Sequence, residues 1–116
     1  MSSRNSSKAF RVSSHWVVGL AAALALGAAA LPAEAATVTV TIDKLVFSPA
    51  TITAKVGDTV EWVNKDVIAH TATVKGGWDV MIPAKKSGSI VLKKAGSVDY
   101  YCRFHPNMKG HITVSP

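Results

Sequence analysis

Apolar and polar residues alternate in short runs along the chain from residue 37 onward. In residues 37–42, valine and isoleucine take every second position and threonine takes the positions between them. Because successive side chains of a strand point to opposite faces, this period of two predicts a strand with one buried face. Further runs, some less regular, predict a series of short strands. The expected strands span residues 37–42, 51–56, 59–63, 69–75, 87–93, 98–102 and 110–114.

Turn-forming residues such as Gly57-Asp58 separate these runs, and no helical period appears after residue 36. The segment 76–84 is less regular, and we expect its apolar residues, Met81 among them, to be buried. Many short strands with alternating faces are typical of an all-β domain. The sequence therefore predicts an antiparallel Greek-key β-sandwich or barrel of about seven to eight strands over residues 37–116.

The first 36 residues follow a different pattern, in which a basic opening precedes an uncharged run. Residues 16–31 are rich in alanine, leucine and valine, and Ala33-Glu34-Ala35 offers the small residues that a signal peptidase reads. We therefore expect residues 1–36 to be a secretory signal peptide, cut near Ala35 or Ala36, and the remaining domain to work in the periplasm. An uncleaved membrane anchor is the alternative, but the apolar run is shorter than the ~20 residues of a typical span.

Charge narrows the class of partner. The whole chain has 13 basic and 7 acidic residues, which gives a formal net charge of +6. Without Arg4, Lys8, Arg11 and Glu34, ten basic and six acidic residues remain, so the exported domain is near +4. Its lysines are scattered rather than clustered with aromatic residues, which argues against nucleic-acid binding. A moderate positive charge favours an acidic protein surface as the partner.

The only cysteine, Cys102, begins the most informative stretch of the sequence. One cysteine cannot form an internal disulfide, and metal ligation is one explanation for a lone thiol in an exported protein. His105 and Met108 follow Cys102 at intervals of three, in a loop after an expected strand. Thiolate, imidazole and weakly bound thioether are the ligands of blue-copper electron-transfer sites, which need a second imidazole that His70 can supply. We therefore predict a site for one copper ion, cycling between Cu(I) and Cu(II), built from these four residues.

Other interpretations of these residues stay open. Structural zinc prefers four strong Cys or His ligands, so a methionine argues against zinc as the physiological ion. An iron–sulfur cluster needs more thiolates. A histidine-activated cysteine nucleophile would make the protein an enzyme, but it leaves Met108 and His70 without a role. Taken singly, a cysteine or methionine is more often a buried apolar group. We expect His111 to be a solvent-facing strand residue.

The region 37–116 resembles the cupredoxins, a family of small blue-copper proteins. The short Cys-x-x-His-x-x-Met loop has the spacing of the amicyanin group. The resemblance implies a Greek-key sandwich and a periplasmic one-electron carrier. It also implies His70 as the first ligand, Cys102 as the thiolate, His105 as the second imidazole and Met108 as the axial thioether. The supporting stretches are Phe47-Ser48-Pro49, residues 56–64 and Tyr100-Tyr101-Cys102.

Two positions depart from the pattern of the family. Thr71 stands where many blue-copper proteins carry an asparagine that braces the ligand loop, and its hydroxyl can make a similar hydrogen bond. Phe104 stands where amicyanins have a proline, so we expect a looser loop. The resemblance implies that Phe104, Pro106 and Asn107 form part of an apolar patch, and that electrons pass to a partner through His105.

These observations predict a type 1 copper protein that carries single electrons between redox proteins and is not an enzyme. A dehydrogenase or a c-type cytochrome would suit as a partner. A copper-binding protein for delivery or storage, without a role in a redox chain, is the alternative, and a metal-free interaction module is a third class. We expect a monomer that binds no nucleic acid and, after loss of the signal peptide, no membrane.

Overall fold

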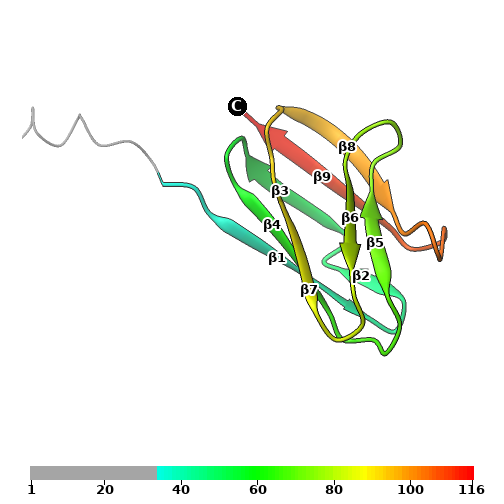
Figure 1. Ribbon diagram of the computed structural model, residues 1–116. Coiled ribbons are helices and arrows are strands. Elements are labelled where there is room, and N and C mark those ends of the chain that lie inside the picture. Colours follow the sequence, from blue (N-terminus) through cyan, green and yellow to red (C-terminus); the bar gives the residue numbers. More distant parts are fainter. Residues whose placement is uncertain (1–33) are drawn as a thin grey trace, which may run out of the picture. The chain divides into compact units, whose positions relative to one another are not determined.

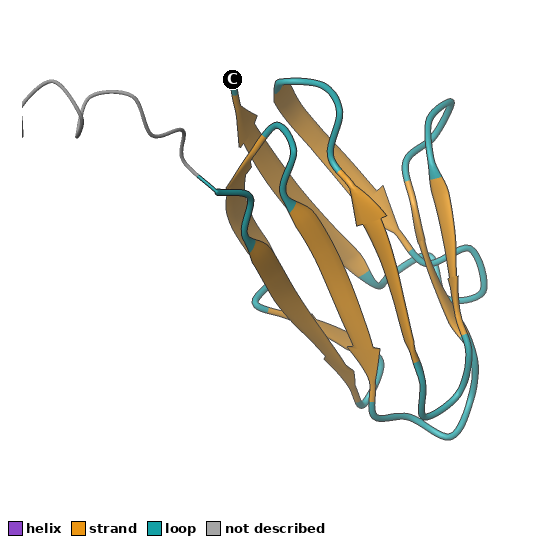
Figure 2. Ribbon diagram, turned by 60° about the vertical axis from the view of Figure 1, so that its left-hand side comes forward, coloured by secondary structure: helices purple, strands orange, loops and turns teal. Residues whose placement is uncertain are grey.

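Nine β-strands form within residues 34–116, which are the residues that the computed structural model describes. Figure 2 shows strands joined by loops throughout this part of the chain. Residues 1–33 lie outside the described residues, and most of the predicted signal peptide falls there. None of the described residues belongs to a helix that would reach across a lipid bilayer. The strands are β1 Thr37–Asp43, β2 Val46–Ser48, β3 Thr51–Lys55, β4 Thr59–Asn64, β5 His70–Thr73, β6 Asp79–Ile82, β7 Ser87–Val91, β8 Gly96–Tyr101 and β9 Lys109–Ser115.

The strands pack as two sheets, which Figure 1 shows as two layers. One sheet has the order β2-β1-β4-β7 and the other has the order β3-β9-β8-β5-β6. The predicted β-sandwich is thereby confirmed. Both sheets are mixed, because β1 pairs with β4 and β3 pairs with β9 in parallel, where we expected antiparallel pairs. Alternation along a strand determines which face is buried, but it carries no information on the direction of the neighbouring strand.

The core lies between the sheets and is filled by the inward positions of the alternating segments. Val40, Ile42, Val60 and Trp62 are fully buried, as the pattern predicts. Trp62 lies edge-on to Tyr100, with ring centroids 5.5 Å apart, and its indole N–H donates a 3.2 Å hydrogen bond to the tyrosine hydroxyl. This bond pairs two polar groups in the interior, so the two large rings fill the core without leaving an unsatisfied donor.

Two strands were missed by the sequence analysis. Phe47 is buried in β2, which lies outside the expected strands, and β6 lies in the segment 76–84 that we described as less regular. In β6, Ile82 is fully buried whereas Met81 is 50% exposed, so the expectation of a buried Met81 is wrong. This strand has only 4 residues and lies at the edge of its sheet, so it is too short to display a clear period.

The order of strands in the larger sheet positions the predicted ligands. His70 is the first residue of β5, and Cys102 directly follows β8, the neighbour of β5 in the sheet. The two strands are antiparallel, with Thr73 opposite Tyr101, so the start of β5 and the end of β8 lie at the same end of the sandwich. Figure 1 shows the loop after β8, in orange, turning back at this end into β9.

A close approach between β8 and β9 accompanies the exit of this loop. Tyr100 faces Gly110 across the two strands. A Cβ atom at Gly110 would lie 2.2 Å from Cζ of the tyrosine ring, so only glycine fits there. The missing side chain lets the ring of Tyr100 lie directly over the strand that follows the ligand loop.

Candidate metal centre

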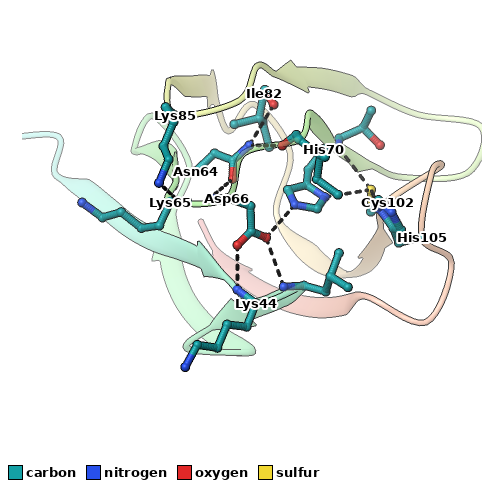
Figure 3. Close-up of polar contacts among 12 residues, drawn as sticks. Lys44, Asn64, Lys65, Asp66, His70, Ile82, Lys85, Cys102 and His105 are labelled. Carbon is teal, nitrogen blue, oxygen red and sulfur yellow. Dashed lines mark hydrogen bonds and ion pairs between the residues drawn. The ribbon is translucent and has the colours of Figure 1, made fainter.

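Three donor groups meet where β5 begins and β8 ends. The Sγ atom of Cys102 lies 3.7 Å from Nδ1 of His70 and 3.8 Å from Nδ1 of His105. The donor atoms of the three residues all lie within 4.8 Å of one another. His70 and Cys102 are fully buried and His105 is half-buried. The structure thus brings together three of the four predicted ligands, and Figure 3 shows both imidazole rings beside the sulfur.

The spacing of these atoms suits a shared ion better than direct hydrogen bonds. A separation of 3.7 Å or 3.8 Å between sulfur and nitrogen is long for a strong hydrogen bond. Two metal bonds of ~2.3 Å to sulfur and ~2.0 Å to nitrogen, with an angle of about 120° between them, place sulfur and nitrogen about 3.7 Å apart. The donor set therefore fits one metal ion held between two imidazoles and a thiolate.

Three backbone hydrogen bonds close the loop 102–108. The amide of Cys102 donates to the carbonyl of Met108 at 3.1 Å, and the amide of Met108 donates to the carbonyl of His105 at 2.9 Å. The amide of His105 donates to the carbonyl of Cys102 at 3.2 Å. Met108 is only 4% exposed, so its side chain is turned into the protein. Its place as the fourth, axial ligand stays a prediction.

Thr71 connects the start of β5 to the ligand loop. Its amide N–H points at Sγ of Cys102, 3.4 Å away, and its hydroxyl accepts a 2.9 Å hydrogen bond from the amide of Arg103. A donor aimed at the sulfur helps to fix its position and partly balances the charge of a thiolate. The Thr71 hydroxyl thus makes a hydrogen bond to the ligand loop, a contact that the sequence left open. His111 instead bonds to Asp99 at 2.7 Å with its side chain 37% exposed, as expected for an outward-facing residue.

A carboxylate that we did not predict holds the ring of His70. Nε2 of His70 lies 2.8 Å from Oδ2 of Asp66, on the side of the ring opposite to Cys102. A ring N–H bonded to a carboxylate leaves the other nitrogen free to bind a metal and makes it more basic. The arrangement therefore fixes which nitrogen of His70 faces the candidate site.

Asp66 also supports the tight turn between β1 and β2. Its Oδ1 accepts the amide N–H of Lys44 at 2.8 Å, and its Oδ2 accepts that of Leu45 at 3.1 Å (Figure 3). Both turn residues have positive φ, 52° and 65°, which is unfavourable for side chains other than glycine, asparagine and aspartate. The carboxylate thus stabilises a strained turn and links it to a predicted ligand.

The charge state of Asp66 follows from these contacts. Desolvation is the largest single influence and raises the pKa of Asp66, but the amide of Leu45, the ring of His70 and the amide of Lys44 outweigh it. The pKa is therefore lowered overall, and the group is a carboxylate at neutral pH. Asn64, which is 2% exposed, accepts the amide N–H of Asp66 at 2.9 Å and so holds this loop in place.

Sequence reasoning missed Asp66 because its contacts depend on how two loops meet. The turn residues that it binds lie more than 20 positions away along the chain. The one local signal is its place four residues before His70, in a loop, and that spacing is common without any contact. The sequence therefore shows a carboxylate four residues before a predicted histidine ligand, but it does not show what that carboxylate binds.

Comparison with known proteins identifies the class to which this fold and site belong. Residues 16–114 match the family model described as a cupredoxin-like domain. The match covers most of the chain, so the protein belongs to the cupredoxin family. The resemblance seen in the sequence is thereby confirmed.

Within that family, the chain is similar to the amicyanins. It is 35% identical over 96 residues to the amicyanin of Paracoccus versutus, a match that covers 77% of this chain and 71% of that protein. It is 33% identical over 102 residues to amicyanin-alpha of Methylorubrum extorquens, with 80% and 86% covered. The Cu(I) form of an amicyanin with a methionine-to-alanine substitution matches at a TM-score of 0.62 and 28% identity, covering 76% of this chain and 89% of that one.

Replacement of Asp66 by asparagine tests the role of this carboxylate. An amide accepts weaker hydrogen bonds than a carboxylate, so Asp66→Asn is expected to lower the free energy of unfolding of the metal-free protein by about 1–2 kcal/mol. It is also expected to lower the affinity of the site for a metal by about tenfold or more. Urea unfolding and metal competition measure the two effects. Asp43→Asn, at an exposed carboxylate, is the matched control, and equal results for the two variants would contradict the assigned role.

Proposed function

We propose that this protein is a type 1 copper electron carrier whose metal ligands are His70, Cys102, His105 and Met108. The observation that carries the proposal is the buried cluster of one thiol and two imidazole nitrogens, at separations suited to one ion. The position of this cluster in a cupredoxin fold, with a buried methionine in the same loop, supports copper over other metals. Three strong donors and a thioether are a poor match for structural zinc, which prefers four strong ligands.

Copper in such a site supplies a one-electron couple between Cu(I) and Cu(II). The contribution of the polypeptide is to hold the donors in place before any metal arrives. Asp66 orients the ring of His70, and the amide of Thr71 points at the sulfur of Cys102. Because these bonds do not involve the metal, the donor atoms have little need to move when an electron is gained or lost. A small rearrangement favours fast transfer of single electrons, and the proposal therefore describes a carrier and not an enzyme.

We propose that electrons enter and leave through His105. His105 is half-buried, whereas His70 and Cys102 have no exposed area, so His105 is the predicted ligand nearest to the surface. The adjacent Phe104 is 47% exposed. Three further exposed apolar side chains lie in the two loops that Asp66 joins, at Leu45, Val67 and Ile68. Exposed apolar residues at the end of the sandwich that holds the ligands suit brief docking of another redox protein, such as a dehydrogenase or a c-type cytochrome.

We further propose that the domain is exported to the periplasm and begins at Ala36. The unit that contains the nine described strands starts at Ala35, which agrees with removal of the preceding residues. The backbone nitrogen of Ala36 donates a 2.9 Å hydrogen bond to Oδ1 of Asp58, whose other oxygen accepts the amide of Lys55. Cleavage after Ala35 would turn this amide into an ammonium group beside a carboxylate, whereas cleavage after Ala36 would remove the donor.

A visible absorption spectrum of the copper-loaded protein tests the proposed function. One equivalent of Cu(II) is expected to produce an intense visible band from charge transfer between the thiolate and the metal, and the band is expected to disappear reversibly on reduction. Cys102→Ser is expected to abolish the band, because the hydroxyl replaces the soft sulfur donor. A colourless wild-type protein after cupric loading would refute the type 1 site. Binding of Cu(I) without reversible oxidation would favour delivery or storage instead.

Substitution of Phe104 tests the docking face. Phe104→Glu is expected to slow electron transfer with the physiological partner by about tenfold, because a charge in an apolar contact must be desolvated without a counter-charge. The visible spectrum of the site is expected to stay unchanged. Stopped-flow kinetics measure the rate, and Val91→Glu, at an exposed apolar residue of β7 away from the ligand loop, is the control. Equal rates for the two variants would count against this face.

The mature N-terminus is expected to be Ala36, and intact mass measurement of the exported protein checks this. Asp58→Asn is expected to lower the free energy of unfolding at pH 7. The amide of Ala36, followed by that of Lys55, holds the pKa of Asp58 below its ordinary value. The contribution of Asp58 is therefore complete above about pH 4 and is lost as the pH falls through the lowered pKa. An N-terminus at Thr37, or an effect of the substitution that is as large at pH 2 as at pH 7, would contradict this assignment.

A further inference from the structure

A ring of hydrogen bonds joins the ligand loop to the hairpin of β5 and β6. The amide of Arg103 donates to Oγ1 of Thr71 at 2.9 Å. Oγ1 of Thr71 lies 2.9 Å from Oγ1 of Thr73, whose hydroxyl donates to Oδ1 of Asp79 at 2.5 Å. Asp79 in turn accepts Nε of Arg103 at 3.1 Å and Nη2 at 3.2 Å, one on each oxygen. The path therefore leaves the backbone of Arg103 and returns to its own side chain.

The donors and acceptors in this ring run in one direction. Asp79 is a carboxylate with no proton to give, so Thr73 must donate to it and must accept from Thr71. The hydroxyl of Thr71 is then free to accept the amide of Arg103. The hydroxyl of Thr73, followed by the guanidinium of Arg103, holds the pKa of Asp79 below its ordinary value, so the carboxylate persists at neutral pH. The carboxylate thus determines the orientation of both hydroxyls.

Burial divides the ring into an inner part and an outer part. Thr71 and Thr73 are 0% and 7% exposed, whereas the side chains of Arg103 and Asp79 are 40% and 48% exposed. An exposed ion pair alone contributes little to stability. Here the pair also closes a path through two buried hydroxyls that ends at the residue next to Cys102. Its effect therefore falls on the position of the loop more than on the stability of the fold.

We propose that Thr73, Asp79 and Arg103 are positioning residues that fix the Cys102 end of the ligand loop through this ring. The inference rests on the proposed function, since it concerns the same site. The ring holds Arg103 by both its backbone and its side chain, so the chain that leaves Cys102 has little freedom to turn. The ring thereby supplies the rigidity that the loop would lose with phenylalanine in place of proline at position 104.

Thr73→Val tests the ring at its middle, because valine has nearly the same shape and no hydroxyl. In the metal-free protein, the amide of Arg103 is expected to exchange its hydrogen about tenfold faster. In the copper-loaded protein, the rate of electron self-exchange is expected to fall by about tenfold, with copper still bound one to one. Thr73→Ser restores the hydroxyl and is expected to behave as the wild type in both measurements. Thr53→Val, at an exposed position of β3 in the same sheet, is the matched control.

Exchanging the charges of Asp79 and Arg103 distinguishes the ring of hydrogen bonds from a simple ion pair. The double variant Asp79→Arg with Arg103→Asp keeps one positive and one negative group at these positions, but arginine cannot accept the hydroxyl of Thr73. It is expected to show the same faster amide exchange and slower self-exchange as Thr73→Val. Behaviour like the wild type would overturn the ring and leave only an ion pair.

Hydrogen exchange and electron self-exchange also allow this inference to be tested separately from the proposed function. Hydrogen exchange is followed in the metal-free protein, so it tests the ring even if the protein binds no copper. Unchanged exchange at Arg103 in Thr73→Val would overturn the inference. Unchanged self-exchange in a blue, copper-loaded Thr73→Val would also overturn it, while leaving the proposed electron carrier intact.

Discussion

The fully buried thiol of Cys102, with an imidazole nitrogen on either side, is the constraint on which the rest of this end of the sandwich depends. A buried polar group is costly unless it has a partner, and three such groups converge here. The described residues leave no buried side-chain nitrogen or oxygen without a hydrogen-bond partner. The ring of His70 is bonded to Asp66, and Thr71 is bonded to Thr73 and to the backbone of Arg103. The donor atoms are thus left facing one another, which is the arrangement that a metal ion requires.

Two carboxylates provide this support through separate sets of contacts. Asp66 connects the ring of His70 to the turn between β1 and β2, in the smaller sheet, and Asp79 connects the start of the ligand loop to β6, at the edge of the larger sheet. Each accepts several donors, and for each the net effect of its surroundings is a lowered pKa. The site therefore depends on both sheets. Loss of either carboxylate would leave donors unsatisfied at some distance from the sulfur and would act on the metal only through the positions of its ligands.

The sequence predicted the parts of this arrangement that are local. The spacing of Cys102, His105 and Met108 lies within one loop, and the alternation of apolar residues gave the buried faces of β1 and β4. Asp66 also binds a turn residue 22 positions away and Asp79 binds Arg103 24 positions away, and no pattern along the chain encodes these two contacts. The same limit explains the parallel pairing of β1 with β4, which depends on the path taken between them. Met81 was assigned to the core because it is apolar, but the edge of the sheet leaves its side of β6 uncovered.

The hydrogen bonds that hold the predicted ligands differ from one ligand to the next, and this difference agrees with the proposed role in electron transfer. His70 is held by the side chain of Asp66 from the preceding loop, Cys102 is held by the amide of Thr71 in β5, and neither ligand has exposed area. The backbone of His105 is held within its own loop, and this residue is half-buried and follows the exposed Phe104. A carrier must keep its donors still and must also bring one of them close to a partner. Rigid support from the buried side meets the first need, and a short loop that projects a single imidazole meets the second. The guanidinium of Arg103 lies over the aromatic ring of Phe104, 5.4 Å from its centroid. The cycle of hydrogen bonds through Thr71, Thr73, Asp79 and Arg103 therefore extends to the edge of the proposed docking face.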